Sequence, residues 1–488
     1  MLVSAIFFES NLQPFPVNSH LVYKIFDHHS MKRTFAVLLL LTFITLNTFG
    51  QSVSEKKFSS QQLREDLAYL KLQLFRVHAY PYSELSKEQY EQLFDKIDHQ
   101  LKDSLTNIDF LKLIKPAVAY LSDEHASISL SPKMLPGVYQ DEPVFFPLIL
   151  SKKGNSYYLA KTLSNQTELL GQAIIQIDGI DIKDVVAKCA LYTTGYPEQR
   201  AEKALAQFGY LYSISIPGAH HQYTIETDSK KAVTVQGVIL QTWFNEITQQ
   251  SGWNLACNEA ISYQKINDAG YINACSFLVG DKKIDSLKQR LDVIFAQVQK
   301  DKLKYLFIDV SKNGGGNSSV GNVLIDYFYD KSYTTYRCYW KKSEEYLKLV
   351  QSWGIEPGNQ YKEEQDGGVL HFPSDTIYAE SNPYRFKGKV IVIIGNGTFS
   401  SAIMFATIIK DNHIAELAGE IPVNGHPNHF GEMYNTKLPN TQIDLRFGVK
   451  EWIRPSGEKT DNILRPDITI DPSITREKLV KEVIVKVK

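Results

Sequence analysis

The chain has 488 residues, of which 43% are hydrophobic and 12% aromatic, so it is long enough to bury a large core. This length predicts about two to four domains. The 53 basic and 54 acidic residues leave a formal net charge of −1, which gives no electrostatic reason to expect nucleic acid or an anionic membrane as a partner.

The four cysteines lie far apart in the sequence, at Cys189, Cys257, Cys275 and Cys338. None of them has the short CxxC spacing that a structural zinc site uses. We therefore expect buried small side chains, or at most one or two disulfides.

Residues 1–50 are predicted to be a targeting segment that lies outside the fold. Met31-Lys32-Arg33 is a short basic start, residues 34–46 are mostly apolar, and Asn47-Thr48-Phe49-Gly50 ends the run. This is the pattern of a secretory signal peptide, which is too short to span a membrane. We expect residues 1–30 to be a gene-start extension. The mature chain is then expected to be secreted or periplasmic, without a stable membrane anchor.

Residues 51–130 are predicted to form an N-terminal helical domain. Apolar residues recur near a spacing of 3.6 in 63–75, again in 90–97, and in a third segment from Asn107 to about Leu121. His125 follows this third segment, where the helical periodicity gives way to alternation. A histidine at such a boundary is more often structural than catalytic, and both roles stay open at this point.

Residues 131–240 are predicted to form a small β-rich module, because short β-like runs alternate with turns. Within it, residues 171–190 have the pattern of a strand, an Asp178-Gly179 turn, a short strand and a helix. This segment resembles the PDZ fold, whose members bind extended peptide ends by adding a strand to a sheet edge. A structural β-domain without a ligand is the alternative.

Residues 241–475 are predicted to form an α/β core. Strand-like runs at 270–274 and 305–310 alternate with helix-like segments at 285–300 and 320–328. This alternation favours a mostly parallel sheet with helices on both faces.

Two further segments accompany the core. Residues 331–386 are rich in Tyr, Lys and Glu and are expected to be a surface excursion, and 476–488 are expected to form a C-terminal tail.

A strand-turn-helix pattern lies within residues 388–420. The apolar run 390–394 stops at Gly395-Asn396-Gly397, and after residues 398–401 an apolar run at helical spacing follows over 402–409. Backbone N–H groups and the helix dipole favour negative charge at such a junction. A serine nucleophile needs that setting because attack on a carbonyl creates an oxyanion. A simple helix N-cap is the alternative.

A second glycine turn, 314–316, follows the strand-like run 305–310. It lacks the G-x-x-x-x-G-K-[ST] order of a phosphate-binding loop, because Lys312 precedes the glycines. Its backbone N–H groups suit an oxyanion equally well, and active sites of parallel sheets lie at the carboxyl ends of strands. This pairing favours a serine hydrolase over nucleotide binding at 313–319.

Three segments, in order, resemble the C-terminal processing peptidase family, which includes the tail-specific proteases and tricorn. They are DVSKNGGG at 309–316, GTFSSA at 397–402 and AGE at 418–420. The resemblance covers roughly residues 120–470. It implies a multidomain α+β and α/β chain, with a crotonase-like peptidase core after the helical segment and the PDZ-like module. It also implies protein or peptide substrates and no cofactor or metal, and the sequence contains no HExxH motif.

The resemblance also assigns site residues. It places the nucleophile on Ser401 and the oxyanion donors on the backbone N–H groups of Ala402 and of Gly315, with Gly314 beside it. Where the tail-specific branch has its lysine, after Glu420, this sequence has none. A Ser–Lys dyad is therefore not expected.

The tricorn-like branch takes its base from an earlier segment, which 123–126 (Asp-Glu-His-Ala) resembles. We therefore expect His125 to be the base, with His426 and His429 as alternatives. Glu458 lies about where that branch keeps its orienting acid. The competing acids are Asp461 and Glu432.

The sequence thus predicts a secreted serine endopeptidase of the tricorn-like branch, which forms an acyl-enzyme on Ser401. The alternatives are a catalytically inactive ligand- or peptide-binding protein on the same fold, and an esterase or amidase. The physiological substrate and the oligomeric state are left open.

Overall fold

The computed structural model describes residues 56–131, 134, 142–164, 166–218, 221–229, 232–250, 257 and 259–487. The expected signal segment lies outside these ranges. In the part of the chain that is described, no helix is long and apolar enough to cross a membrane.

The N-terminal segment folds into three packed helices, one for each periodic segment. They are α3 (Ser60–Val77), α4 (Lys87–Asp98) and α5 (Asn107–Ala119), with a short ladder of β1 (Lys57–Phe58) and β2 (Leu105–Thr106) at their base. Ser59, Ser86 and Thr106 each accept from the third helical N–H in a capping box, which explains where the helices begin.

The core holds a six-stranded sheet in the order β10-β11-β12-β17-β18-β21. Its strands are β10 (Ile261–Ile266), β11 (Ala269–Ala274), β12 (Tyr305–Asp309), β17 (Lys389–Ile394), β18 (Glu416–Gly419) and β21 (Ile468–Thr469). Only the β10–β11 hairpin is antiparallel, so the predicted mostly parallel sheet is confirmed.

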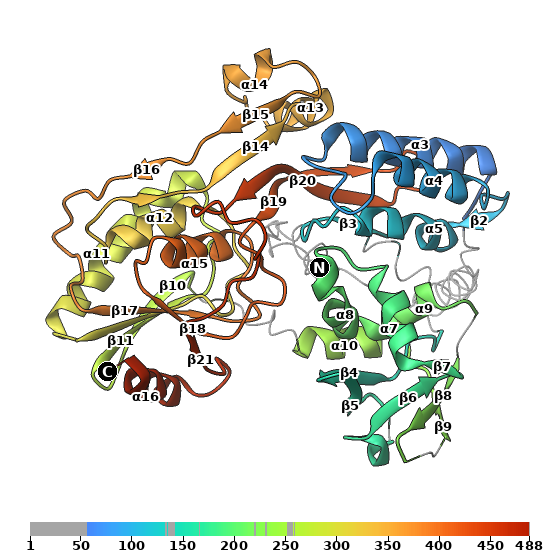
Figure 1. The fold of residues 1–488 in the computed structure, drawn as a ribbon, viewed down its shortest axis with the longest axis horizontal. Coiled ribbons are helices and arrows are strands. Elements are labelled where there is room, and N and C mark those ends of the chain that lie inside the picture. The colour runs from blue at the N-terminus through green and yellow to red at the C-terminus, as the bar shows by residue number, and fades with distance from the viewer. Residues whose placement is uncertain are drawn as a thin grey trace, which may run out of the picture.

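Helices cover both faces of this sheet (Figure 1). On one face lie η2 (Asp281–Lys283), α11 (Ile284–Lys300), α12 (Ser319–Asp326) and α15 (Ser401–Asp411), and on the other lies α16 (Arg476–Val487). Side chains of a strand point alternately to the two faces of the sheet. Leu306 and Ile308 of β12 are buried under α11, α12 and α15, whereas Phe307 is buried on the face that α16 covers. Residues 476–487 of the expected C-terminal tail therefore form a helix that packs on the sheet.

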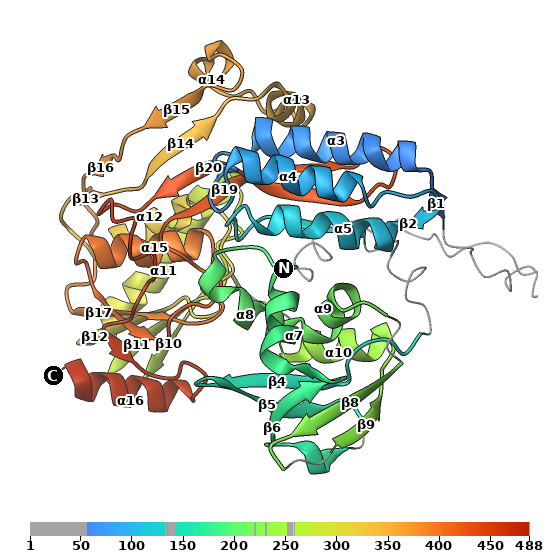
Figure 2. The same cartoon turned by 45° about the vertical axis from the view of Figure 1, so that its right-hand side comes forward.

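A second sheet joins the core to the N-terminal helices. Its order is β15-β14-β20-β19, with β3 paired to β20. The strands are β3 (Ser127–Ser129), β14 (Arg337–Lys341), β15 (Val369–Phe372), β19 (His429–Lys437) and β20 (Asp444–Ile453). In both views the helices α3–α5 lie along the β19–β20 hairpin (Figures 1 and 2).

The interpretation of residues 331–386 as a surface excursion is wrong. This segment supplies β14 and β15 to the second sheet, and Tyr346, Tyr361 and Leu370 are buried in one core with the N-terminal helices. Four of its tyrosines, Tyr333, Tyr336, Tyr346 and Tyr361, are buried, whereas Tyr378 is exposed. The segment also contains β13 (Tyr333–Thr334), α13 (Glu344–Ser352), α14 (Asn359–Glu363) and β16 (Thr376–Ile377).

The β-rich module has the sheet order β4-β5-β6-β8-β9, with β7 paired to β6. Its elements are β4 (Leu148–Lys153), β5 (Ser156–Thr162), η1 (Thr167–Leu169), β6 (Ala173–Ile177), β7 (Ile180–Asp181), α7 (Ile182–Ala190), α8 (Pro197–Ala206), α9 (Phe208–Ser215), β8 (Gln222–Thr227), β9 (Ala232–Gln236) and α10 (Leu240–Gln250). Trp243 of α10 stacks on Phe145 at 5.7 Å between ring centroids, so the expected boundary at 240/241 falls inside a helix that packs on the module.

The cysteine prediction is confirmed. Cys257 and Cys275 form a disulfide, while Cys189 and Cys338 are buried and free.

Asp66 of α3 ties the N-terminal helices to the tip of the β19–β20 hairpin. Its carboxylate is fully buried and accepts from the backbone N–H groups of Asn440 and Thr441, both at 2.8 Å. We expect Asp66→Ala to lower the free energy of unfolding by about 3 kcal/mol, because buried donors lose their acceptor. Urea denaturation measures this change. As a control, Asp98→Ala removes only the exposed pair with Arg64 and should cost below about 1 kcal/mol. Equal losses would contradict the prediction.

Candidate active site

Ser401 is the first residue of α15 and follows the turn that ends β17. Its side chain is 4% exposed, and its Oγ has no hydrogen-bond partner in the described part of the chain. The preceding residue, Ser400, has φ +52° and ψ −127°, an uncommon conformation for a non-glycine residue. Ser400 is the N-cap but makes no side-chain capping bond, so neither hydroxyl caps the helix.

The two glycine turns lie against each other. The N–H of Gly397 donates to the carbonyl of Ser311 at 2.9 Å, and the N–H of Phe399 donates to the carbonyl of Asn313 at 3.0 Å. Gly315 has φ +97°, and a Cβ added there would lie 2.7 Å from the Ser400 Cβ and 3.0 Å from the Ser401 nitrogen. Only glycine therefore allows this turn to approach the serine so closely.

Two of the expected oxyanion donors are already bonded within the protein. The N–H of Ala402 donates to the carbonyl of Phe399 at 3.1 Å, and that of Gly315 donates to Asn313 Oδ1 at 2.8 Å. Among the described hydrogen bonds, none uses the N–H of Gly314, which is exposed. An oxyanion at this site would have to replace the two present acceptors, as catalytic hydrogen bonds often form only in the substrate complex.

His125 lies between α5 and β3, beside the turn that precedes Ser401. Its ring stacks on Phe399, two residues before Ser401, with the centroids 4.5 Å apart. Its Nδ1 is buried, has no hydrogen-bond partner within the described ranges and lies 3.9 Å from Asp123 Oδ1. Burial lowers the pKa of His125 to about 4, with the charges of His429 and Arg446 acting in the same direction. The imidazole is therefore neutral at pH 7.

The two alternative histidines lie nearby with other partners. His426 is fully buried, and its Nδ1 is 2.7 Å from Glu124 Oε1. His429 has its Nδ1 at 3.1 Å from the carbonyl of His426, and its ring is 6.0 Å from that of His125. No hydrogen bond within the described residues joins any of the three to the Ser401 hydroxyl.

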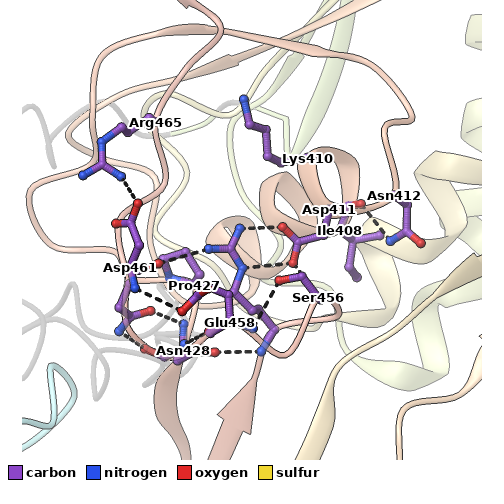
Figure 3. Close-up of polar contacts among 12 residues, drawn as sticks. Ile408, Lys410, Asp411, Asn412, Pro427, Asn428, Ser456, Glu458, Asp461 and Arg465 are labelled. Carbon is purple, nitrogen blue, oxygen red and sulfur yellow. Dashed lines mark hydrogen bonds and ion pairs between the residues drawn. The ribbon is translucent and has the colours of Figure 1, made fainter.

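The expected orienting acids have their contacts elsewhere. Glu458 lies on the loop after β20, where its carboxylate accepts from Thr460 and from the N–H of Asp461. Asp461 pairs with Arg465 (Figure 3). Glu432 pairs with Lys450. The contacts described for these three carboxylates do not include His125, so their catalytic role stays a prediction.

Asn428 anchors the loop that carries Glu458 (Figure 3). Its Nδ2 donates to the main-chain carbonyl of Glu458 at 2.7 Å, and its Oδ1 accepts from the N–H of Arg454 at 2.8 Å. The Arg454 guanidinium pairs in turn with Asp411 at the end of α15. These contacts connect the loop that carries Glu458 to the helix that carries Ser401.

The carboxylate nearest to His125 is that of Asp123, which the family resemblance includes only as part of the 123–126 segment. In the sequence, this proximity was indicated by the two-residue spacing between Asp123 and His125. In the part of the chain that is described, no group of three or more His, Cys, Asp or Glu side chains is placed to hold a metal ion.

Comparisons with known proteins address the family. Residues 268–470 match the model of peptidase family S41. The structure of mature CPAF complexed with lactacystin aligns with a TM-score of 0.55 at 16% identity, over 88% of this chain and 97% of that chain. The photosystem II D1 C-terminal processing protease aligns with a TM-score of 0.39 at 14% identity, over 87% and 96%. No curated protein sequence matches. At these identities the likeness to CPAF shows the fold.

Proposed function

Because residues 268–470 place this chain in peptidase family S41, and it is accordingly a serine-type peptidase, we propose that it is an endopeptidase that forms an acyl-enzyme on Ser401 with His125 as base. The observation that supports this assignment is the position of Ser401. Its buried hydroxyl, which has no hydrogen-bond partner among the described residues, lies at a helix N-terminus, against the Gly314–Gly316 turn and near Phe399, on which His125 stacks.

In the proposed reaction, Ser401 Oγ attacks the carbonyl carbon of the scissile peptide bond while the neutral His125 imidazole takes its proton. The negative charge moves to the carbonyl oxygen, which accepts from backbone N–H groups of Ala402 and the glycine turn. The tetrahedral intermediate collapses, the C–N bond breaks, and His125 protonates the leaving amine. Water then attacks the ester by the same route and releases Ser401.

The β-rich module would hold an extended peptide segment at a sheet edge, as PDZ-like modules do. We further propose that the protein works outside the cytoplasm. The Cys257–Cys275 disulfide supports this location, because disulfides persist in oxidising compartments.

The pH dependence of turnover follows from the burial of His125. A base acts in its neutral form, and burial lowers the pKa of His125 to about 4 from the ordinary value near 6.5. As pH rises through 4 the neutral fraction increases, so kcat/KM should rise there and change little between pH 5.5 and 7. A pH–rate profile on a neutral peptide measures this limb. An acid limb near 6.5 would contradict it.

A substrate panel tests the proposed function against its alternatives. We expect cleavage of casein-derived peptides at internal bonds, and covalent labelling by a fluorophosphonate. An esterase or amidase would instead cleave small esters or amides and leave the peptides intact. An inactive binding protein would neither turn over peptides nor react with the probe.

A further inference from the structure

We propose that Asp123 is the positioning residue that orients His125, and that His78 holds the Asp123 carboxylate in place. This inference rests on the proposed function, because it assumes that His125 is the base. It gives to the chain's own Asp-x-His segment the role that the family resemblance suggests for Glu458.

Asp123 is fully buried, and each carboxylate oxygen has a backbone donor. Oδ1 accepts the N–H of His125 at 2.7 Å, and Oδ2 accepts the N–H of Gly448 on β20 at 2.7 Å. Both oxygens are therefore fixed relative to the backbone of His125 and to the second sheet. A carboxylate held this firmly can define the orientation of a neighbouring ring.

His78 supplies the third partner of this carboxylate. It is fully buried, and its Nε2 lies 3.4 Å from Asp123 Oδ2, an ion-pair distance at which the described residues show no hydrogen bond to this nitrogen. Its Nδ1 accepts the N–H of Tyr80 at 3.1 Å, so the ring proton lies on Nε2 and faces the carboxylate. The ring packs on Phe430 and Phe447, with centroids 4.7 and 5.6 Å away. These contacts leave His78 little freedom to turn from Asp123.

The charge of Asp123 is maintained despite its burial. Burial raises the pKa of a carboxyl group, but the nearby His78 and His125 rings and the Gly448 N–H outweigh it and lower the pKa of Asp123 to about 2. Asp123 is thus an acceptor over the whole working range.

The ring of His125 has one free nitrogen on the side of this acceptor. Its Nδ1 lies 3.9 Å from Asp123 Oδ1 and has no hydrogen-bond partner in the described part of the chain. A movement of about 1 Å brings it to hydrogen-bond distance. With the proton on Nδ1 directed at Asp123, the lone pair of Nε2 is available for the proton of Ser401.

The position of Glu458 differs from that of Asp123. It is exposed on the loop after β20, and its carboxylate accepts hydrogen bonds from Thr460 and Asp461. Apart from Asp123, the charged or titratable groups that act on His125 are Glu124 in the same segment, His429 on β19 and Arg446 on β20. Glu124 is already bonded to His426.

The experiment compares Asp123→Asn with Glu458→Gln in the full chain, by kcat, KM and pH profile on one peptide. We expect Asp123→Asn to lower kcat about 100-fold with KM within about 2-fold, because the wrong ring tautomer is then favoured. Its acid limb should move to lower pH, because the Asp123 charge raises the pKa of His125. Arg446→Gln should move that limb to higher pH, since the Arg446 charge lowers the same pKa. His78→Gln should lower kcat about 10-fold.

The proposal would be overturned if Asp123→Asn lowers kcat less than about 3-fold and leaves the acid limb of the pH profile unmoved. It would also be overturned if Glu458→Gln, and not Asp123→Asn, shows the 100-fold loss of kcat. An unchanged kcat in His78→Gln would remove the role of His78. If Asp123→Asn does not fold, ¹⁵N NMR of the histidine-labelled wild-type chain decides, with His125→Gln for assignment. A proton on Nδ1 of His125 supports the proposal, and one on Nε2 overturns it. Full activity in Ser401→Ala or in His125→Gln would instead contradict the proposed function itself.

Discussion

Replacing Ser401 with alanine is expected to lower peptide turnover by about 10⁴-fold or more and to abolish fluorophosphonate labelling. The chain then lacks the oxygen that forms the acyl-enzyme. The fold should persist, because the Ser401 hydroxyl has no hydrogen-bond partner among the described residues that its loss would leave unpaired. Turnover measured together with labelling, followed by mass spectrometry, tests this expectation.

The neighbouring serine provides a matched control. Ser400 makes no capping hydrogen bond, so Ser400→Ala should keep labelling and most of the turnover. Labelling that is lost in Ser400→Ala and kept in Ser401→Ala would move the nucleophile by one residue. Peptide turnover that survives both substitutions would contradict the acyl-enzyme.

Replacing His125 with glutamine is expected to lower kcat by about 10³- to 10⁴-fold, because the serine hydroxyl loses its base. KM should change little, since the ring is 9% exposed and stacks on Phe399. Steady-state kinetics at pH 7 measure both quantities. Any fluorophosphonate labelling that remains in His125→Gln should be slow, and its rate should no longer rise as the pH increases through about 4.

The two nearby histidines are the controls for this result. His429→Gln should keep most of the activity, because its Nδ1 contacts the carbonyls of His426 and Pro427. His426→Gln removes the contact with Glu124, so its thermal stability must be measured beside its turnover. If one of these variants loses the activity that His125→Gln retains, that histidine is the base.

The local elements of the fold could be predicted from the sequence. The strands 305–309 and 389–394 are mostly apolar runs followed by glycine turns at 314–316 and 395–397, and the helix that starts at Ser401 has the apolar spacing of a buried helix. Such signals are local, because the period of the apolar residues and the turn residues lie within one segment. The mixed fold class and the family could be predicted for the same reason.

The buried part of residues 331–386 could not be predicted from the sequence. Their composition favours a surface position, yet Tyr346 and Tyr361 are buried, and Lys341 of the same segment donates to the carbonyl of Phe75 in α3, more than 200 residues earlier in the chain. Composition cannot indicate a partner so distant in sequence. The boundary at 240 failed similarly, since Trp243 is placed by its contact with Phe145.

By itself, the sequence determined the strand-turn-helix that carries Ser401 and the two glycine turns, because their signals lie in consecutive residues. Only the tertiary structure decided which groups surround them. It brings His125 onto Phe399, places Asp123 between His125 and His78, and leaves Glu458 on an exposed loop. The physical reason is that a hydrogen bond or a ring contact depends on distances of a few ångströms. Such distances arise from the packing of α3, β19 and β20 around the site.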